Sequence, residues 1–191
     1  EEPVEQKVEE ANFWLKSLVP TKFDNKEEAL QGARDIVAEW INENTDSRNI
    51  IRKIFNQQAI LISKVKKAKK DAAEKYLDYF DFSESLKKIP SHRVLAILRG
   101  ENEGFLSVKI DVSKEDVLFK LHKYWQIRDN WTGKEFANAI EESYDRLLFP
   151  SIENEYLQTI KLKADKEAIE IFATNLKQLL LASPLGDKRI L

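Results

Sequence analysis

Apolar residues recur at steps of three and four over most of this chain. That spacing places them on one face of an α-helix. Pro150 suits the first turn of a helix, so we expect a long final helix from there to about Leu181. The pattern predicts the other helices over about 4–19, 26–43, 46–58, 91–99, 114–125 and 132–148.

One segment breaks this helical period. Apolar and polar residues alternate over 105–112, which predicts a half-buried strand. Residues 60–65 are rich in β-branched side chains and fit either a strand or the start of a helix. We therefore predict a mainly α fold, a multi-helix array with one short β element at about 105–112 that could pair with 60–65.

Breaks in the pattern divide the chain into expected parts. We expect an N-terminal helical part with a helix-turn-helix-like hairpin, a central helical part with the small β element, a long connecting helix, and the start of a truncated further domain. Their expected ranges are 1–58, 59–149, 150–186 and 187–191. The sequence contains no Met, and it ends on residues typical of an entering strand. We expect it to be a fragment of a longer protein.

Composition removes several classes of function. The 191 residues are 42% apolar and 34% charged, as in globular proteins, and they include no Cys and two His. Thiolate chemistry is excluded, and a multi-histidine metal centre is disfavoured. No apolar run approaches the length of a membrane span, and the first residues are acidic. We expect a cytoplasmic protein with no cofactor, no metal and no membrane partner.

The net charge of −2 conceals one basic segment. Residues 48–75 contain nine Lys or Arg and two acids, a local net charge of +7. Such a cluster beside a β-rich run and aromatic residues is typical of nucleic-acid binders, although lysines also occupy ordinary solvated surfaces. The candidates for phosphate contact are Lys64, Lys66, Lys67, Lys69 and Lys70.

The predicted hairpin of helices 26–43 and 46–58 resembles a helix-turn-helix. Arg48 and Arg52 lie one turn apart on its second helix, where a recognition helix would present them to DNA. The alternative is a plain helical hairpin. His92 and Arg93, at a predicted helix N-terminus, could hold an anion or simply pack.

Two further groups have a structural alternative. The aromatic residues Tyr76, Tyr79, Phe80 and Phe82 could stack bases, but their spacing also fits a core face. Glu101 and Glu103 have no third acidic partner for a divalent cation, so pairing with a local Arg is the favoured role. No phosphate-binding glycine loop or hydrolase motif occurs. We expect no enzymatic activity.

Residues 90–104 read Pro-Ser-His-Arg-Val-Leu-Ala-Ile-Leu-Arg-Gly-Glu-Asn-Glu-Gly. This segment resembles a signature of the bacterial Tex family of transcription accessory factors, and shorter matches keep the family order from about residue 29 to 191. The matched motif residues are Ser91, His92, Arg93, Arg99, Gly100, Glu101 and Gly104. We expect structural roles for them: Ser91 as a helix cap, Gly100 or Gly104 at positive φ, and Arg99 with Glu101 as a clamp.

The resemblance implies a long multidomain protein in which this chain is the end of the N-terminal region and the central helical region. The resolvase-like YqgF domain and the C-terminal RNA-binding domain would follow it. The resemblance thus implies a helical scaffold or interaction region with weak electrostatic nucleic-acid contact at most. The implied partners are RNA or DNA, through the full-length protein, and the transcription machinery. The alternative is a DNA-binding helix-turn-helix module.

Overall fold

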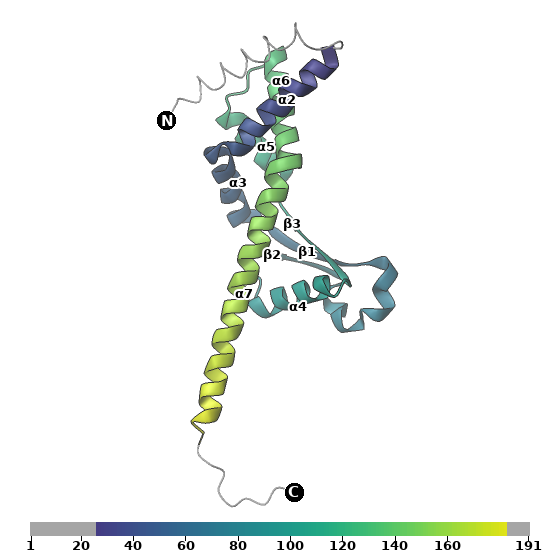
Figure 1. The fold of residues 1–191 in the computed structure, drawn as a ribbon, viewed down its shortest axis with the longest axis vertical. Helices are drawn as coiled ribbons and strands as arrows, with labels where there is room; N and C mark the ends of the chain where they lie inside the picture. Colours follow the sequence, from purple (N-terminus) through teal and green to yellow (C-terminus); the bar gives the residue numbers. More distant parts are fainter. Residues whose placement is uncertain (1–25, 183–191) are drawn as a thin grey trace, which may run out of the picture. The chain divides into compact units, whose positions relative to one another are not determined.

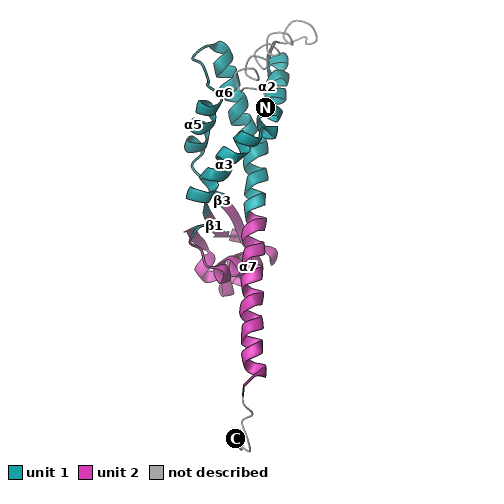
Figure 2. Cartoon of the chain, turned by 90° about the vertical axis from the view of Figure 1, so that its left-hand side faces the viewer, with its two compact units in different colours: residues 1–60, 85–87, 110–156 teal, residues 61–84, 88–109, 157–191 magenta. Residues whose placement is uncertain are grey.

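The computed structural model describes residues 26–182, and these are mainly helical, as predicted (Figure 1). The helix predicted over 4–19 and the expected domain start at 187–191 lie outside the described residues. The chain divides into two units (Figure 2). The first unit comprises residues 1–60, 85–87 and 110–156, and the second comprises 61–84, 88–109 and 157–191.

The first unit is a bundle of helices. They are α2 (Lys26–Glu43), α3 (Thr45–Gln58), α5 (Lys114–Tyr124), α6 (Trp131–Ser143), the short η3 (Tyr144–Leu148) and the first residues of α7 (Phe149–Leu180). α2 packs along α6. Its buried face repeats every fourth residue, at Ala29, Ala33, Val37 and Ile41. The small side chains allow a close approach, and the Ser143 hydroxyl of α6 donates to the Ala38 carbonyl at 2.7 Å.

α6, η3 and α7 follow one another without a loop (Figure 1). Pro150 lies in the first turn of α7 and the helix runs to Leu180, as predicted, but α7 begins at Phe149 directly after η3, with no break between the two. η3 is a π-helical turn in which the Phe149 N–H bonds to the Tyr144 carbonyl. A proline ring clashes with the carbonyl four residues before it in a regular α-helix. The wider π turn relieves that clash, so the helix continues through the proline.

The second unit contains most of a three-stranded antiparallel sheet in the order β2-β1-β3. The strands are β1 (Ile60–Val65), β2 (Asp81–Ser85) and β3 (Leu106–Asp111), and the terminal residues Ile60, Ser85 and 110–111 are grouped with the first unit. The predicted strand and its pairing with 60–65 are confirmed. β2 was not predicted.

Helical segments complete the second unit. They are η1 (Lys67–Ala72), η2 (Glu74–Tyr79), α4 (Ser91–Asn102) and α7 from residue 157. α4 buries Val94 and Ile97, and the sheet buries Leu61, Ser63 and Leu106. α7 buries Ile152 near its start and Ala164 at mid-helix, whereas Phe172, Leu176 and Leu180 near its end are exposed. No helix among the described residues has the length and apolar character needed to span a membrane.

We expect Gly133, near the start of α6, to tolerate no side chain. A Cβ placed there would lie 1.9 Å from the backbone carbonyl oxygen of Arg128, and a backbone atom cannot yield as a flexible side chain can. Gly133→Ala should therefore lower the free energy of unfolding by about 1–3 kcal/mol. Denaturant unfolding followed by circular dichroism measures this change.

Lys134→Ala is the matched control, because Lys134 is exposed on the same turn. It should change the free energy of unfolding by less than about 0.5 kcal/mol. Equal effects of the two substitutions would contradict the predicted clash.

Candidate nucleic-acid interface

The predicted lysine cluster lies on one side of the second unit, where β1 leads into η1. Its five members are all exposed: Lys64, Lys66, Lys67, Lys69 and Lys70. Among residues 26–182, no ion pair joins any of them to an acidic side chain. The structure therefore brings all five lysines to solvent on one short segment.

Backbone hydrogen bonds connect this segment to the start of β3. The Lys66 N–H donates to the Phe105 carbonyl at 2.9 Å, and the Lys69 N–H donates to the Lys66 carbonyl at 2.9 Å. Lys67, Lys69 and Lys70 lie in η1, a 3₁₀ helix. Residues three apart eclipse one another on such a helix, so Lys67 and Lys70 share one edge.

The end of the Tex-like motif lies directly against the lysine segment. The Lys69 ammonium is 5.7 Å from the centroid of the Phe105 ring, and the Lys75 ammonium is 5.7 Å from the same centroid. Gly104 has φ of 77°, as predicted for one of the two motif glycines. A Cβ on Gly104 would lie 3.1 Å from the Lys69 Nζ, so the lysine passes close over the glycine backbone.

Glu103 connects two cations beside this contact. Its carboxylate lies 2.5 Å from the Lys75 Nζ and 3.0 Å from the Arg99 Nε. Hydrogen bonds from Lys75, and then from Arg99, lower the pKa of Glu103 to about 2. The same contact raises the pKa of Lys75. At neutral pH two cations therefore surround one ionised carboxylate, and the three side chains together carry a net positive charge.

The other motif residues have structural contacts, and two of our expectations about them are wrong. Ser91 does not cap α4, since its hydroxyl donates to Glu167 of α7. Arg99 pairs with Glu103 rather than acting with Glu101. Glu101 does join α4 to β3, because its carboxylate accepts from the Val108 N–H at 3.2 Å.

Gly100 is buried in the interior of α4, facing β3. A Cβ there would lie 2.6 Å from the Leu106 side chain and 3.2 Å from Tyr76. His92 is exposed, and Arg93 forms an ion pair with Glu84 at 2.9 Å. Arg93 is thus already paired with a carboxylate of its own unit.

The aromatic cluster is divided between core and half-buried positions. Tyr76 is buried and packs against Phe105 with ring centroids 5.9 Å apart, which fits the core interpretation. Tyr79 and Phe82 are half-buried, and their rings meet edge to face with centroids 5.5 Å apart. The ring of Tyr76 is therefore not available to stack on a base.

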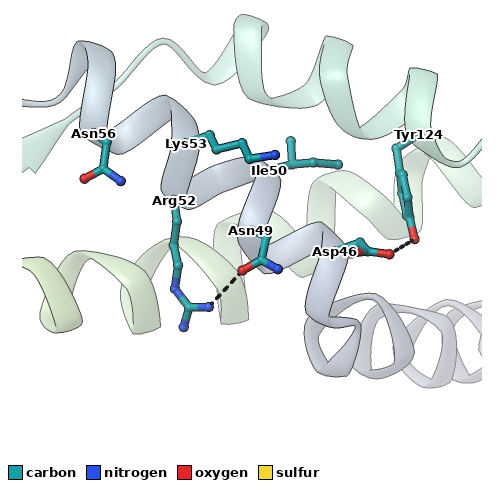
Figure 3. Close-up of a pocket in the computed structure, with 7 residues that line it drawn as sticks. All are labelled: Asp46, Asn49, Ile50, Arg52, Lys53, Asn56 and Tyr124. Atoms are coloured by element: carbon teal, nitrogen blue, oxygen red, sulfur yellow. Dashed lines mark hydrogen bonds between the residues drawn. The ribbon is translucent and has the colours of Figure 1, made fainter.

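α3, in the first unit, carries the predicted arginines and a polar outer face. A pocket of about 530 Å³ runs along this outer face, where Asp46 accepts a hydrogen bond from the Tyr124 hydroxyl at 2.9 Å (Figure 3). The exposed polar residues of α3 that line the pocket are Asp46, Asn49, Lys53 and Asn56, and the half-buried Arg52 lines it as well. Asn49 and Asn56 were not predicted as site residues, although their spacing of seven residues places them on one helical face.

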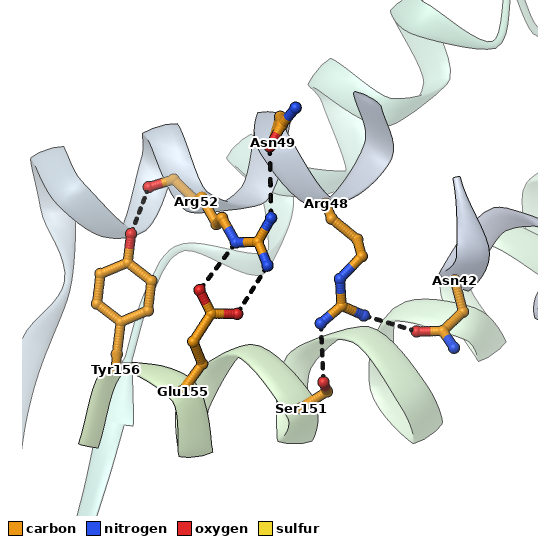
Figure 4. A network of polar contacts seen from close by, with 7 residues as sticks. All are labelled: Asn42, Arg48, Asn49, Arg52, Ser151, Glu155 and Tyr156. Carbon is orange, nitrogen blue, oxygen red and sulfur yellow. Dashed lines mark hydrogen bonds and ion pairs between the residues drawn. The ribbon is translucent and has the colours of Figure 1, made fainter. Parts of the chain in front are cut away.

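Arg48 and Arg52 point to the start of α7 (Figure 4). The Arg52 guanidinium donates two hydrogen bonds to Glu155, from Nε to Oε1 at 2.9 Å and from Nη2 to Oε2 at 2.8 Å. Arg48 donates to the Ser151 hydroxyl at 2.9 Å and to the Asn42 side chain at 3.2 Å. The bidentate bond raises the pKa of Arg52 and lowers the pKa of Glu155.

A third contact closes the same junction. The Tyr156 hydroxyl donates to the Arg52 carbonyl at 2.9 Å, and its ring packs on Phe55 with centroids 5.0 Å apart. Burial raises the pKa of Tyr156.

In the described residues, no His, Asp and Glu side chains gather in a group of three that could hold a metal ion.

Residues 3–172 match a family model described as Tex central region-like. The chain belongs to the Tex family. It is 36% identical over 168 residues to the uncharacterized protein YdcI of Bacillus subtilis, covering 87% of this chain and 23% of that protein. It is 35% identical over 164 residues to the transcriptional accessory protein Tex of Neisseria gonorrhoeae, covering 83% of this chain and 22% of that protein.

A human relative carries a different name. The S1 RNA-binding domain-containing protein 1 of Homo sapiens is 31% identical over 175 residues, which cover 84% of this chain and 17% of that protein. The chain thus spans less than a quarter of the length of each of these Tex-family relatives. The motif at 90–104 falls inside the matched region.

We expect the Glu103 carboxyl to titrate with a midpoint of about 2 in the wild-type chain. Its folded pKa lies below the ordinary value of 4.5, so its ion pairs stabilise the fold above pH 4.5 and are lost as the pH falls toward 2. In Lys75→Met the midpoint should rise toward 4.5, because the largest cause of the lowered pKa is removed. NMR titration of the side-chain carboxyl measures both.

Lys88→Met, at an exposed lysine of the same unit, serves as the control and should leave the midpoint in place. A midpoint near 4.5 in the wild-type chain would contradict the assigned contacts.

Proposed function

We propose that this chain is a non-enzymatic helical scaffold and interaction region of a Tex-like, RNA-binding transcription accessory factor. The names of two relatives, a transcriptional accessory protein and an S1 RNA-binding domain-containing protein, support this general assignment. In this proposal RNA or DNA binds through the full-length protein, and the transcription machinery is the further partner. The chain itself makes weak electrostatic contact with nucleic acid.

One observation carries the scaffold role: the arginines on α3 are used inside the first unit. Arg48 and Arg52 donate to Ser151 and Glu155 of α7. A guanidinium that reads a base edge must point its donors into the DNA groove. Because these donors are directed at another helix of the same unit, their role in the proposal is to join α3 to α7.

The alternative, a DNA-binding helix-turn-helix module, would need a different reading face. α3 would have to turn its pocket-lining side, with Asn49, Lys53 and Asn56, to the groove. That face carries two cations, Arg52 and Lys53, but the Arg52 guanidinium is held by Glu155, and the face also includes Asp46, an anion that phosphates would repel. The charge of the face therefore favours the scaffold over the alternative.

Replacing the α3 arginines tests the proposal. We expect Arg52→Ala to lower the thermal midpoint by about 2–4 °C, since an ion pair with this exposure contributes up to about 1 kcal/mol. Affinity for a labelled oligouridine and for a mixed-sequence duplex should change by less than about two-fold, because Arg52 is not at the nucleic-acid surface. Differential scanning fluorimetry and fluorescence anisotropy give the two readouts.

Lys53→Ala is the matched control on the same helix and should leave the thermal midpoint unchanged. Tight, sequence-selective duplex binding that disappears in Arg48→Ala and Arg52→Ala would establish the alternative instead. Cleavage of an oligonucleotide that depends on Mg²⁺ would overturn the non-enzymatic part of the proposal.

A further inference from the structure

The exposed lysines and the end of the Tex-like motif lie within contact distance of each other. Lys66 bonds to the Phe105 carbonyl through its backbone, and the Lys69 ammonium lies over the Phe105 ring. The sequence separates these features by more than thirty residues, and the fold of the second unit brings them together. We propose that they form one site, in which Lys66, Lys67, Lys69 and Lys70 bind the phosphodiester backbone of a single nucleic-acid strand, and in which Gly104 and Phe105 hold the lysine segment in place.

The charge of the site fits a polyanion. The four lysines are exposed and have no ion pair among the described residues, so they bind phosphates without first breaking internal contacts. The anion nearest Phe105, Glu103, already has two cationic partners, Lys75 and Arg99. Two acids follow the lysines: Asp71 comes directly after Lys70 in η1, and Glu74 begins η2, so the four lysines outnumber the acids of the segment. The lysine segment therefore has a net positive electrostatic field, which attracts the row of phosphates along a nucleic-acid strand.

The geometry favours one strand over an acidic peptide. Lys67 and Lys70 lie on one edge of a 3₁₀ helix, about 6 Å apart along its axis. Apart from its lysines, η1 consists of Ala68, Asp71 and Ala72, so it offers no large apolar side chain that a peptide could cover. Lysine ammonium groups act as point charges that attract phosphate without reading a base edge. Binding at this site is therefore independent of base sequence.

The motif residues position the segment. Gly104 adopts φ of 77°, a backbone conformation that residues other than glycine rarely adopt. Because glycine has no Cβ, its backbone leaves room for the Lys69 side chain. The Phe105 ring lies beneath the ammonium groups of both Lys69 and Lys75. Each such cation–ring contact at an exposed site contributes about 0.5–1 kcal/mol. In this account the glycine and the ring preorganise Lys69 and do not touch the nucleic acid.

The inference rests on the proposed function, in which the chain contacts nucleic acid weakly, and the test separates the two. Labelled oligouridine and oligothymidine of about twelve nucleotides are titrated with the whole chain at several salt concentrations, and anisotropy gives the affinities. Four phosphate contacts predict a slope of about −3 for log affinity against log salt. The two probes should bind within about two-fold of each other, because the 2′-hydroxyl is not read.

Charge reversal then locates the site. Lys66, Lys67, Lys69 and Lys70 replaced together by Glu should lower the affinity at least ten-fold and abolish the salt slope. The matched control reverses four exposed lysines of α7 in the same unit, Lys161, Lys163, Lys166 and Lys177, which changes the net charge equally. The control should retain most of the affinity. Equal losses in both variants would overturn the site while leaving weak nucleic-acid contact intact.

Single substitutions test the positioning residues. Lys69→Gln should reduce the slope by about 0.7, the value for one phosphate contact on a single strand. Phe105→Leu should lower the affinity two- to five-fold without changing the slope, because it loosens Lys69 but removes no charge. A changed slope in Phe105→Leu, or tighter binding of polyglutamate than of oligouridine, would overturn the inference. Binding that does not depend on salt would instead overturn the proposed function.

Discussion

The bidentate ion pair between Arg52 and Glu155 sets the orientation of α3 within the first unit. The Arg52 guanidinium donates two hydrogen bonds to Glu155, and the Tyr156 hydroxyl bonds to the carbonyl of the same arginine. Arg48 adds a second contact one turn away, at Ser151. A planar guanidinium forms such paired bonds in one geometry, so the junction fixes the rotation of α3 as well as its distance from α7. The outer face of α3 follows from that rotation.

The continuous run of α6, η3 and α7 depends on a second constraint. Pro150 cannot donate a backbone hydrogen bond, and its ring would strike the preceding turn of an ideal α-helix. The π turn at 144–148 resolves this locally, and the helix proceeds to Leu180. The start of α7 that carries Ser151 and Glu155 lies directly after that turn. The arginine contacts on α3 therefore rely on a helix that passes through its proline unbroken.

Helices α2 to α7, the strand at 105–112 and its pairing with 60–65 could be predicted, because apolar periodicity records which face of an element is buried. β2 could not, because Asp81–Ser85 has little intrinsic β-propensity and forms a strand only by pairing with β1. The sequence also did not predict that the Arg52 side chain points to α7. Arg48 and Arg52 share the four-residue spacing of Ser151 and Glu155, but periodicity does not say which helices are neighbours.

For the Tex-like motif at 90–104, too, the sequence predicted local conformation but not the tertiary contacts. A glycine at positive φ was predicted, and Gly104 has it. The role of Gly104 depends on Lys69, whose side chain lies beside the glycine. Lys69 comes 35 residues earlier in the chain and was assigned to a separate cluster. The exposed lysines were identified from charge alone, whereas their support by Phe105 required the fold. Residue types thus indicated the chemistry, and tertiary contacts determined which residues act together.

A double-mutant cycle in the free energy of unfolding tests the central claim that Arg52 is a structural residue joined to Glu155. Arg52→Ala, Glu155→Ala and the double variant are unfolded with denaturant and compared with the wild-type chain. We expect a coupling energy of about 0.5–1 kcal/mol, because each single substitution removes the same contact. Strictly additive effects, with a coupling energy of zero, would show that the arginine is free of α7 and would contradict the account.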